Sequence, residues 1–203
     1  MEKINKIRKI LIVLCIILII ILISYVLVIN LTRKEESSST KEPHNSSESI
    51  KYEKHTSYDN LFIIETPKTW QEIENKNSLN EKAILELYNE TENAYLVIVV
   101  NAKKDLNENF ESYKKDVFGQ KETYYKTKIT KYCDVVIDNY NARYGEIYYT
   151  NSDNINTYIR AYAFETNNYY GQLILWTLAS NEQIVQEEFN KISESLIEKK
   201  VDE

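Results

Sequence analysis

The first hydrophobic segment of the chain contains no charge. No charged residue lies between Lys9 and Arg33, and Ile10 to Ile29 are nearly all aliphatic. Twenty helical residues rise about 30 Å, which is the thickness of the hydrocarbon core of a bilayer. In lipid a single segment must satisfy its own backbone hydrogen bonds, and only a helix does so. The pattern therefore predicts a transmembrane helix over residues 10–31.

A cleaved signal peptide and a lipoprotein signal are two other interpretations of this segment. A signal peptide has an apolar run of about 7–15 residues and then small residues, whereas this run is longer and has no such site. Cys15 follows Leu14 and precedes further apolar residues, which disfavours lipidation. Four basic residues precede the segment and two follow it closely. We therefore expect an uncleaved signal-anchor, with residues 1–9 in the cytoplasm and the rest of the chain outside.

The next segment, residues 32–58, is polar and rich in serine and glutamate. It offers few apolar side chains for burial, so we expect a flexible linker. The two histidines of the chain, His44 and His55, lie within it. Without further ligands at metal-binding spacing, they are expected to be solvated and to bind no metal.

Residues 59–200 begin with strand patterns. Residues 61–65 form a short apolar run that ends before Pro67, and residues 83–88 and 95–100 form two more runs joined by turn residues. The run over 95–100 is continuously apolar, which predicts a central strand covered on both faces.

Two later segments have the period of a helix. Asp105 is expected to cap the first helix and Gly119 to end it, and the second is expected to begin at Ser180 with Gln183 completing a capping box. Each helix carries one apolar stripe, at Leu106, Phe110, Tyr113 and Val117 in the first and at Val185, Phe189, Ile192 and Leu196 in the second.

Four strand patterns lie between these helices, over residues 123–137 (bent or broken once), 142–150, 155–165 and 169–178. Asparagine-rich junctions separate them, and Asn167-Asn168 suits a two-residue hairpin because asparagine tolerates positive φ. Successive hairpins give an antiparallel sheet on which both helices bury their stripes. The predicted fold class is α+β, with a mainly antiparallel sheet of about six to seven strands flanked by two amphipathic helices and preceded by one transmembrane helix.

Two short motifs resemble the PsbP-like domains. One is an apolar strand running into Pro67-x-x-Trp70, and the other is Tyr169-Tyr170-Gly171-Gln172-Leu173-Ile174-Leu175-Trp176 followed by a final helix near Glu187-Glu188-Phe189. The resemblance covers residues 60–198, with Ser195-Leu196 where family members often have Ser-Phe. It implies an antiparallel sheet between helices, no enzymatic activity, and accessory or assembly roles in bacterial proteins that are often membrane-anchored. The calcium and manganese associations of the photosynthetic member do not carry over, because their ligands have no counterpart here.

Charge divides the chain into two unequal parts. Residues 1–34 contain six of the 25 basic residues and one of the 31 acidic residues, so they carry +5 and the remainder carries −11. An acidic body argues against a nucleic-acid partner, since phosphates require a positive surface. Cys133 lies in a strand pattern and is expected to be a small buried hydrophobe.

Catalytic motifs are missing from the sequence of residues 59–200. This part has no histidine, no glycine-rich phosphate loop and no serine nucleophile motif. Carboxylates are numerous, and one alternative is a carboxylate-dependent hydrolase with two of them about 5–10 Å apart. Those of the last helix, including Glu188, are expected to form a solvated face. We expect no catalytic residue, no cofactor and no metal.

Tyrosine is the most suggestive residue type. Eleven of the 17 tyrosines fall between Tyr124 and Tyr170, and Tyr158, Arg160 and Tyr162 share one face of a strand. Tyrosine and arginine are enriched at binding hot spots, although they also suit half-buried sheet faces. The expected function is a membrane-anchored, extracytoplasmic, non-enzymatic binding or assembly module for an envelope protein or ligand. The alternative is a glycan or lipid binder that uses this tyrosine-rich face, which a helix packed over the face would rule out.

Overall fold

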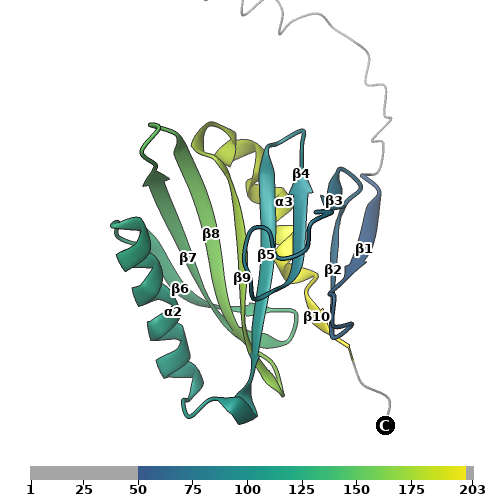
Figure 1. Ribbon diagram of the computed structural model, residues 1–203, viewed down its shortest axis with the longest axis vertical. Helices are drawn as coiled ribbons and strands as arrows, with labels where there is room; N and C mark the ends of the chain where they lie inside the picture. The colour runs from purple at the N-terminus through teal and green to yellow at the C-terminus, as the bar shows by residue number, and fades with distance from the viewer. Residues whose placement is uncertain (1–49, 200–203) are drawn as a thin grey trace, which may run out of the picture. The chain divides into compact units, whose positions relative to one another are not determined.

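The computed structural model describes residues 50–199, and these form an α+β fold (Figure 1). The predicted cytoplasmic residues 1–9, the predicted anchor 10–31 and most of the predicted linker lie outside the described residues. The strands are β1 (Tyr52–Thr56), β2 (Phe62–Pro67), β3 (Trp70–Glu72), β4 (Ala83–Asn89), β5 (Ala94–Ala102), β6 (Lys131–Ile137), β7 (Tyr140–Thr150), β8 (Asn156–Glu165), β9 (Tyr169–Leu178) and β10 (Ile197–Glu198). The helices are α2 (Phe110–Tyr125) and α3 (Glu182–Glu194).

Seven strands form one antiparallel sheet in the order β3-β4-β5-β9-β8-β7-β6. The predicted central position of residues 95–100 is confirmed, because β5 lies between β4 and β9. The hairpin at Asn167-Asn168 is also confirmed, with Thr166 and Tyr169 hydrogen-bonded across it. The positive φ expected at this turn is wrong, since positive φ occurs at other turn residues such as Asp138 and Asn154.

The folded part begins earlier than residue 59. β1 pairs with β2 and forms a second sheet of three strands, in the order β1-β2-β10. His55, expected to be solvated, is buried on β1 and its Nε2 lies 2.9 Å from Oγ1 of Thr66. Only one side of this edge strand is buried, so its sequence is mostly polar and its period of two is too short to distinguish it from a linker.

The first helix is displaced along the chain from the predicted position. It is capped by Asn109, whose side chain accepts a hydrogen bond from the backbone N–H of Ser112. It passes through Gly119 without a break and ends at Lys126, which adopts the left-handed conformation with φ 52°. The segment predicted as a strand from residue 123 therefore starts as helix. Tyr125 of this last turn packs on Tyr149 of β7 with ring centroids 5.0 Å apart, and such tertiary contacts outweigh local strand propensity.

The last helix buries the stripe that the sequence predicted. Val185, Phe189 and Ile192 are buried on α3, and Leu196 is buried just beyond its end. The predicted capping box is wrong, since Asn181 is the first flanking residue and no side chain caps the helix. A short 3₁₀ turn precedes the helix and moves its start past Ser180.

The two helices cover opposite faces of the seven-stranded sheet (Figure 1). α2 packs on β7, β8 and β9. α3 and the three-stranded sheet share the other face, where Phe62 of β2 lies edge-on to Phe164 of β8, with ring centroids 6.1 Å apart. Within residues 50–199, neither helix combines the length and apolar character needed to cross a membrane.

Candidate functional site

The three residues singled out on β8 share one face of the sheet, as their spacing predicted. However, Tyr158, Arg160 and Tyr162 expose only 0%, 3% and 5% of their surface, because α3 packs directly over them. Of the two interpretations of these residues, they fit the buried sheet face and do not form an exposed recognition surface. The apolar stripe of α3 is buried by packing on a sheet face. Tyrosine and arginine side chains on this face have apolar parts that contact the stripe.

Arg160 connects β8 to α3. Its Nη1 donates to the backbone oxygen of Gln186 at 3.1 Å and to Oδ1 of Asn190 at 2.6 Å. Its Nε and Nη2 donate to the hydroxyl of Tyr158 at 3.2 and 3.0 Å. The guanidinium also lies over the ring of Phe189, 5.9 Å from the centroid. The buried cation is therefore hydrogen-bonded in several directions, as a buried charge requires.

Glu146 is the counter-ion of this arginine. It lies on β7 directly opposite Arg160 and is itself buried. Its Oε1 accepts hydrogen bonds from the hydroxyls of Tyr144 and Tyr158, the latter at 3.0 Å, and lies 3.7 Å from Nη2 of Arg160. Burial raises the pKa of Tyr158 above its usual value, so this hydroxyl stays protonated and donates to the carboxylate.

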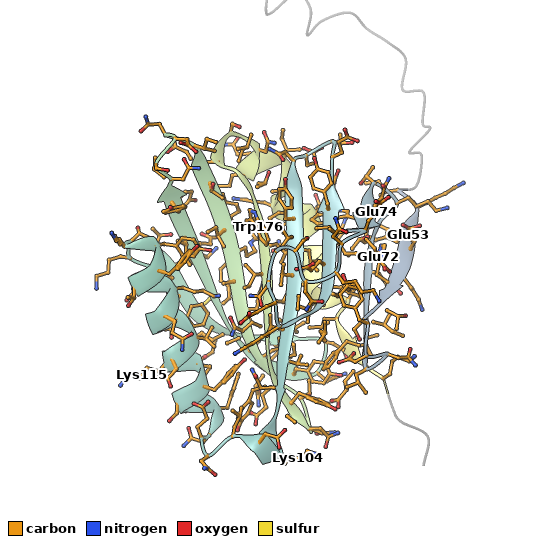
Figure 2. The ribbon with its side chains drawn as sticks, viewed as in Figure 1. Glu53, Glu72, Glu74, Lys104, Lys115 and Trp176 are labelled. Carbon is orange, nitrogen blue, oxygen red and sulfur yellow. The ribbon has the colours of Figure 1, made fainter. Side chains whose placement is uncertain are left out.

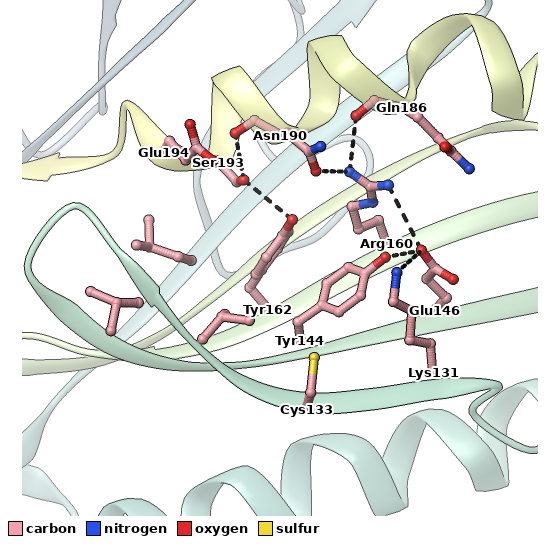
Figure 3. A pocket seen from close by; sticks show the side chains of 13 residues that line it. Lys131, Cys133, Tyr144, Glu146, Arg160, Tyr162, Gln186, Asn190, Ser193 and Glu194 are labelled. Carbon is pink, nitrogen blue, oxygen red and sulfur yellow. Dashed lines mark hydrogen bonds and ion pairs between the residues drawn. The ribbon is translucent and has the colours of Figure 1, made fainter.

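A cleft of about 300 Å³ opens beside this network, between α3 and the β6–β7 hairpin (Figure 3). We call it the α3 cleft. Its polar lining residues are Lys131, Cys133, Tyr144, Glu146, Arg160, Tyr162, Gln186, Asn190, Ser193 and Glu194, and its apolar ones are Val135, Val136 and Ile137. Ser193 donates to the hydroxyl of Tyr162 at 3.2 Å, so the cleft floor is fixed by hydrogen bonds within the fold.

Cys133 stands at the mouth of this cleft and is exposed, which corrects the prediction that it is buried. It lies on β6, the edge strand of the large sheet. An edge strand has a neighbour on one side only, and the α3 cleft lies between β6 and α3. The apolar residues of β6, including Val136, are therefore more exposed than their strand-like sequence suggested.

Several polar groups that line the α3 cleft already have partners within the fold. Two carboxylates line it, Glu146 and Glu194. The Oε1 of Glu146 is already engaged by two tyrosines and Arg160, which disfavours the two-carboxylate hydrolase. Within residues 50–199, no group of three or more histidine, cysteine, aspartate or glutamate side chains is arranged to hold a metal ion. The arrangement suits binding by preformed side chains.

Sequence reasoning missed Glu146, Lys131 and Asn190, because they come from three different elements. A partial signal for Glu146 exists, since it follows Tyr144 by two residues and so shares its face of β7. Nothing in the sequence pairs β7 with β8 in the register that brings Glu146 opposite Arg160.

Comparisons with known proteins support the fold at low sequence identity. No protein-family profile and no curated protein sequence matches the chain. The solution structure of cyanobacterial PsbP (CyanoP) from Synechocystis sp. PCC 6803 aligns with a TM-score of 0.57 and 9% identity, covering 79% of this chain and 99% of that one. The fold is PsbP-like.

Two crystal structures resemble this chain with similar TM-scores. LpqN, involved in cell envelope biogenesis of Mycobacterium tuberculosis, has a TM-score of 0.50 and 9% identity, covering 73% of this chain and 90% of that one. A protein from Bacteroides thetaiotaomicron has a TM-score of 0.51 and 17% identity, covering 72% of this chain and 48% of that one. At these identities the likeness concerns the fold.

The motifs behind the resemblance have structural roles in this PsbP-like fold. Trp70 is fully buried, and its Nε1 donates to Oε1 of Glu188 on α3 at 2.6 Å. Glu188 is therefore half-buried rather than part of a solvated face, and burial raises its pKa. Gly171 on β9 lies against the ring of Phe164, where a Cβ would come within 2.1 Å of Cζ. Both motifs hold α3 and the strands in place.

Proposed function

We propose that the chain is a membrane-anchored, non-catalytic binding or assembly module. Residues 10–31 span the lipid bilayer with residues 1–9 in the cytoplasm, and the PsbP-like domain works outside the cell membrane. Its partner is a protein of the cell envelope that contacts the α3 cleft. The proposal is supported by the similar fold of LpqN, which is involved in cell envelope biogenesis, and assigns a comparable envelope role to this chain.

The feature that carries the proposal is the internally satisfied floor of the α3 cleft. Arg160 and Glu146 each use their polar atoms on neighbours within the fold. Among the described residues, no buried side-chain nitrogen or oxygen lacks a hydrogen-bond partner. A site that must move protons or form covalent bonds needs a group within reach of its substrate, whereas a binding surface needs a rigid floor and an accessible rim. Val136, which is 65% exposed, supplies such a rim.

Edge-strand geometry suits a protein partner. β6 is the last strand of the large sheet, so among residues 50–199 its outer backbone groups pair with no other strand. A partner segment can add to such an edge by backbone hydrogen bonds while its side chains enter a neighbouring cleft. Val136 is exposed on this strand and offers an apolar contact beside the cleft.

The topology is tested with Cys133, which is exposed at the cleft mouth. A membrane-impermeant maleimide added to intact cells is expected to label the wild-type protein and to leave Cys133→Ser unlabelled. Cys15 lies in the predicted anchor, so it should stay unmodified in both. Labelling of Cys133 only after the cells are permeabilised would place the domain inside and overturn the proposal.

The partner surface is tested by photo-crosslinking in intact cells. A photoreactive amino acid at Val136 is compared with one at Ile184, which has the same exposed fraction of 65%. On α3, position 184 is about 200° from Gln186 and so faces away from the cleft. We expect a discrete adduct from position 136 only, and its loss when Glu194→Arg is added at the cleft rim. Equal adducts from both positions, or none from position 136, would contradict this role for the cleft.

A further inference from the structure

The sheet face opposite α3 carries a second hollow that the proposed function does not use. One part, of about 710 Å³, lies between α2 and the central strands, and an adjoining part of about 310 Å³ continues toward Tyr149. The two share five lining residues, Leu79, Asn80, Tyr124, Tyr125 and Ile174. We call the combined hollow the α2 groove. It runs between α2 and the segment 73–82, which connects β3 to β4.

The wall formed by the segment 73–82 is preformed. Glu86 on β4 is fully buried, and its carboxylate accepts backbone N–H groups of Ser78, Leu79 and Asn80 at 3.0, 2.9 and 2.8 Å. Three such bonds to one carboxylate fix the segment across the sheet. A ligand entering the α2 groove therefore meets a wall that needs little ordering.

Aromatic rings gather at one end of the α2 groove. Tyr124 and Tyr125 come from the last turn of α2, and Trp176 lies on β9 between α2 and the segment 73–82 (Figure 2). Trp176 stacks on Tyr95 with ring centroids 5.2 Å apart and planes within 12°. Tyr124 is 77% exposed, so most of its ring is accessible. Flat exposed rings offer stacking surfaces to a flat apolar face.

Polar groups line the larger part of the α2 groove, and four of them are amides. The side-chain amides of Asn80, Asn101, Gln120 and Gln172 all contribute to the lining. Nζ of Lys121 donates to Oε1 of Gln172 at 3.0 Å, and burial lowers the pKa of Lys121 to about 8. An amide both donates and accepts hydrogen bonds, which matches a hydroxyl group that does the same.

The charges that line the α2 groove cancel. Lys82 and Lys121 oppose Glu108 and Asp116. A nucleic acid or an anionic lipid surface requires excess positive charge, so this balance favours an uncharged ligand.

Backbone pairing disfavours a peptide as the occupant. β5 and β9 form the floor of the α2 groove, and each has a hydrogen-bonded strand on both sides. An extended peptide gains much of its affinity from free backbone groups at a sheet edge, and this floor offers none. The ligand must be held by side chains alone, through stacking and hydrogen bonds to hydroxyl groups.

We propose that the α2 groove binds an extended, uncharged oligosaccharide. Sugar rings stack their C–H faces on Tyr124 and Trp176, and their hydroxyl groups exchange hydrogen bonds with the amides of Gln120 and Gln172. Between Val97 and Asn101 the floor strand β5 runs about 13 Å, which accommodates a short oligosaccharide. This site is independent of the α3 cleft, since it lies on the other face of the sheet.

The test uses the purified full chain and three tetrasaccharides, cellotetraose, maltotetraose and the tetramer of N-acetylglucosamine. We expect at least one to bind and to change the fluorescence of Trp176, because Trp70 is fully buried on the other face. Tyr124→Ala should weaken that binding at least tenfold without affecting the fold, since the ring is mostly exposed. Tyr52→Ala, an exposed tyrosine of the three-stranded sheet, is the matched control and should leave the affinity unchanged.

Three results would overturn the proposal. The first is that none of the tetrasaccharides binds at millimolar concentration. The second is that Tyr124→Ala and Tyr52→Ala bind as the wild type does. The third is that the chain binds vesicles of neutral phospholipid through Tyr124 in preference to every tetrasaccharide, which would make lipid the occupant.

Discussion

Arg160 and Glu146 form the main polar contact of the buried core. They come from adjacent strands, and the tyrosine hydroxyls around them complete their hydrogen bonds. A buried ion pair adds little net stability compared with apolar residues of the same shape, but loss of one partner leaves the other charge uncompensated. The pair therefore acts mainly to fix the position of α3 on β8.

Substitution of this arginine should be costly. Arg160→Met is expected to lower the free energy of unfolding by about 3–5 kcal/mol, because the buried Glu146 then keeps only the mostly exposed Lys131, 3.8 Å away, as a counter-ion. Adding Glu146→Gln should recover about 1–3 kcal/mol of that loss. The measurement is urea unfolding of the full chain, with Arg143→Met as the control. Arg143 makes two hydrogen bonds to the exposed Asp134, so its loss should cost about 1 kcal/mol, well below the loss at Arg160. Additive effects of the two core substitutions would contradict coupling.

His55 should make the stability depend on pH. Burial lowers its pKa below 6.5, against the opposing effects of Glu53 and Glu72. The unfolded chain then binds a proton at His55 at a higher pH than the folded chain. As the pH falls below about 6.5, the folded state loses stability until its own lower pKa is passed.

The measurement is the urea midpoint at a pH of about 7.5 and of about 5, for the wild type and for His55→Gln. The wild type should lose more stability on acidification than the variant does. The same loss in both proteins would show that His55 is not the group responsible.

At the scale of elements, two glycines differ in the space around them. A Cβ on Gly171 would enter the ring of Phe164 across the β8–β9 pair, whereas a Cβ on Gly119 of α2 would meet nothing within 4 Å. The close contact at Gly171 lets the three-stranded sheet pack on β8, since Phe62 also touches Phe164. Gly119 has no such contact and only weakens its helix.

Alanine at these positions should therefore have effects of opposite sign. Gly171→Ala is expected to lower the free energy of unfolding by about 1–3 kcal/mol through overpacking. Gly119→Ala should raise it by about 0.5–1 kcal/mol, because alanine is the better helix former. Thermal unfolding of the two variants beside the wild type measures both. A neutral Gly171→Ala would mean that Phe164 can move aside.

At the scale of the whole molecule, residues 50–58 contribute to the stability of the domain. β1 belongs to the fold, and Ser57 behind it is buried and accepts backbone N–H groups of Leu61 and Phe62 at 3.1 and 2.9 Å. A fragment that begins at residue 59 loses both the strand and this hydroxyl. It leaves the outer backbone groups of β2 without partners.

A fragment of residues 50–199 should thus be more stable than one of residues 59–199. The expected difference is about 2–4 kcal/mol, from two or more buried backbone groups left without hydrogen bonds. Urea unfolding followed by tryptophan fluorescence compares them. Matching midpoints would restore the linker interpretation of residues 50–58.

Regular patterns in the sequence were enough to predict most elements of the described part. The alternating strands and the two helical stripes reflect burial on one face of an element, which local periodicity records directly. The helix ends were less accurate, because capping at Asn109 and Lys126 depends on backbone geometry that several nearby residues could supply. The charge-free segment over residues 10–31 is a property of composition alone and stays a prediction of an anchor.

The sequence by itself determined which side chains share a face, so Tyr158, Arg160 and Tyr162 were placed together correctly. Only the tertiary structure decided which face α3 covers and which face stays open. Both faces of a central sheet carry aromatic and apolar side chains, and local periodicity is the same whether a helix or solvent lies above them. The register of β7 against β8, and with it the meeting of Glu146 and Arg160, depends on pairing between segments that no local pattern records.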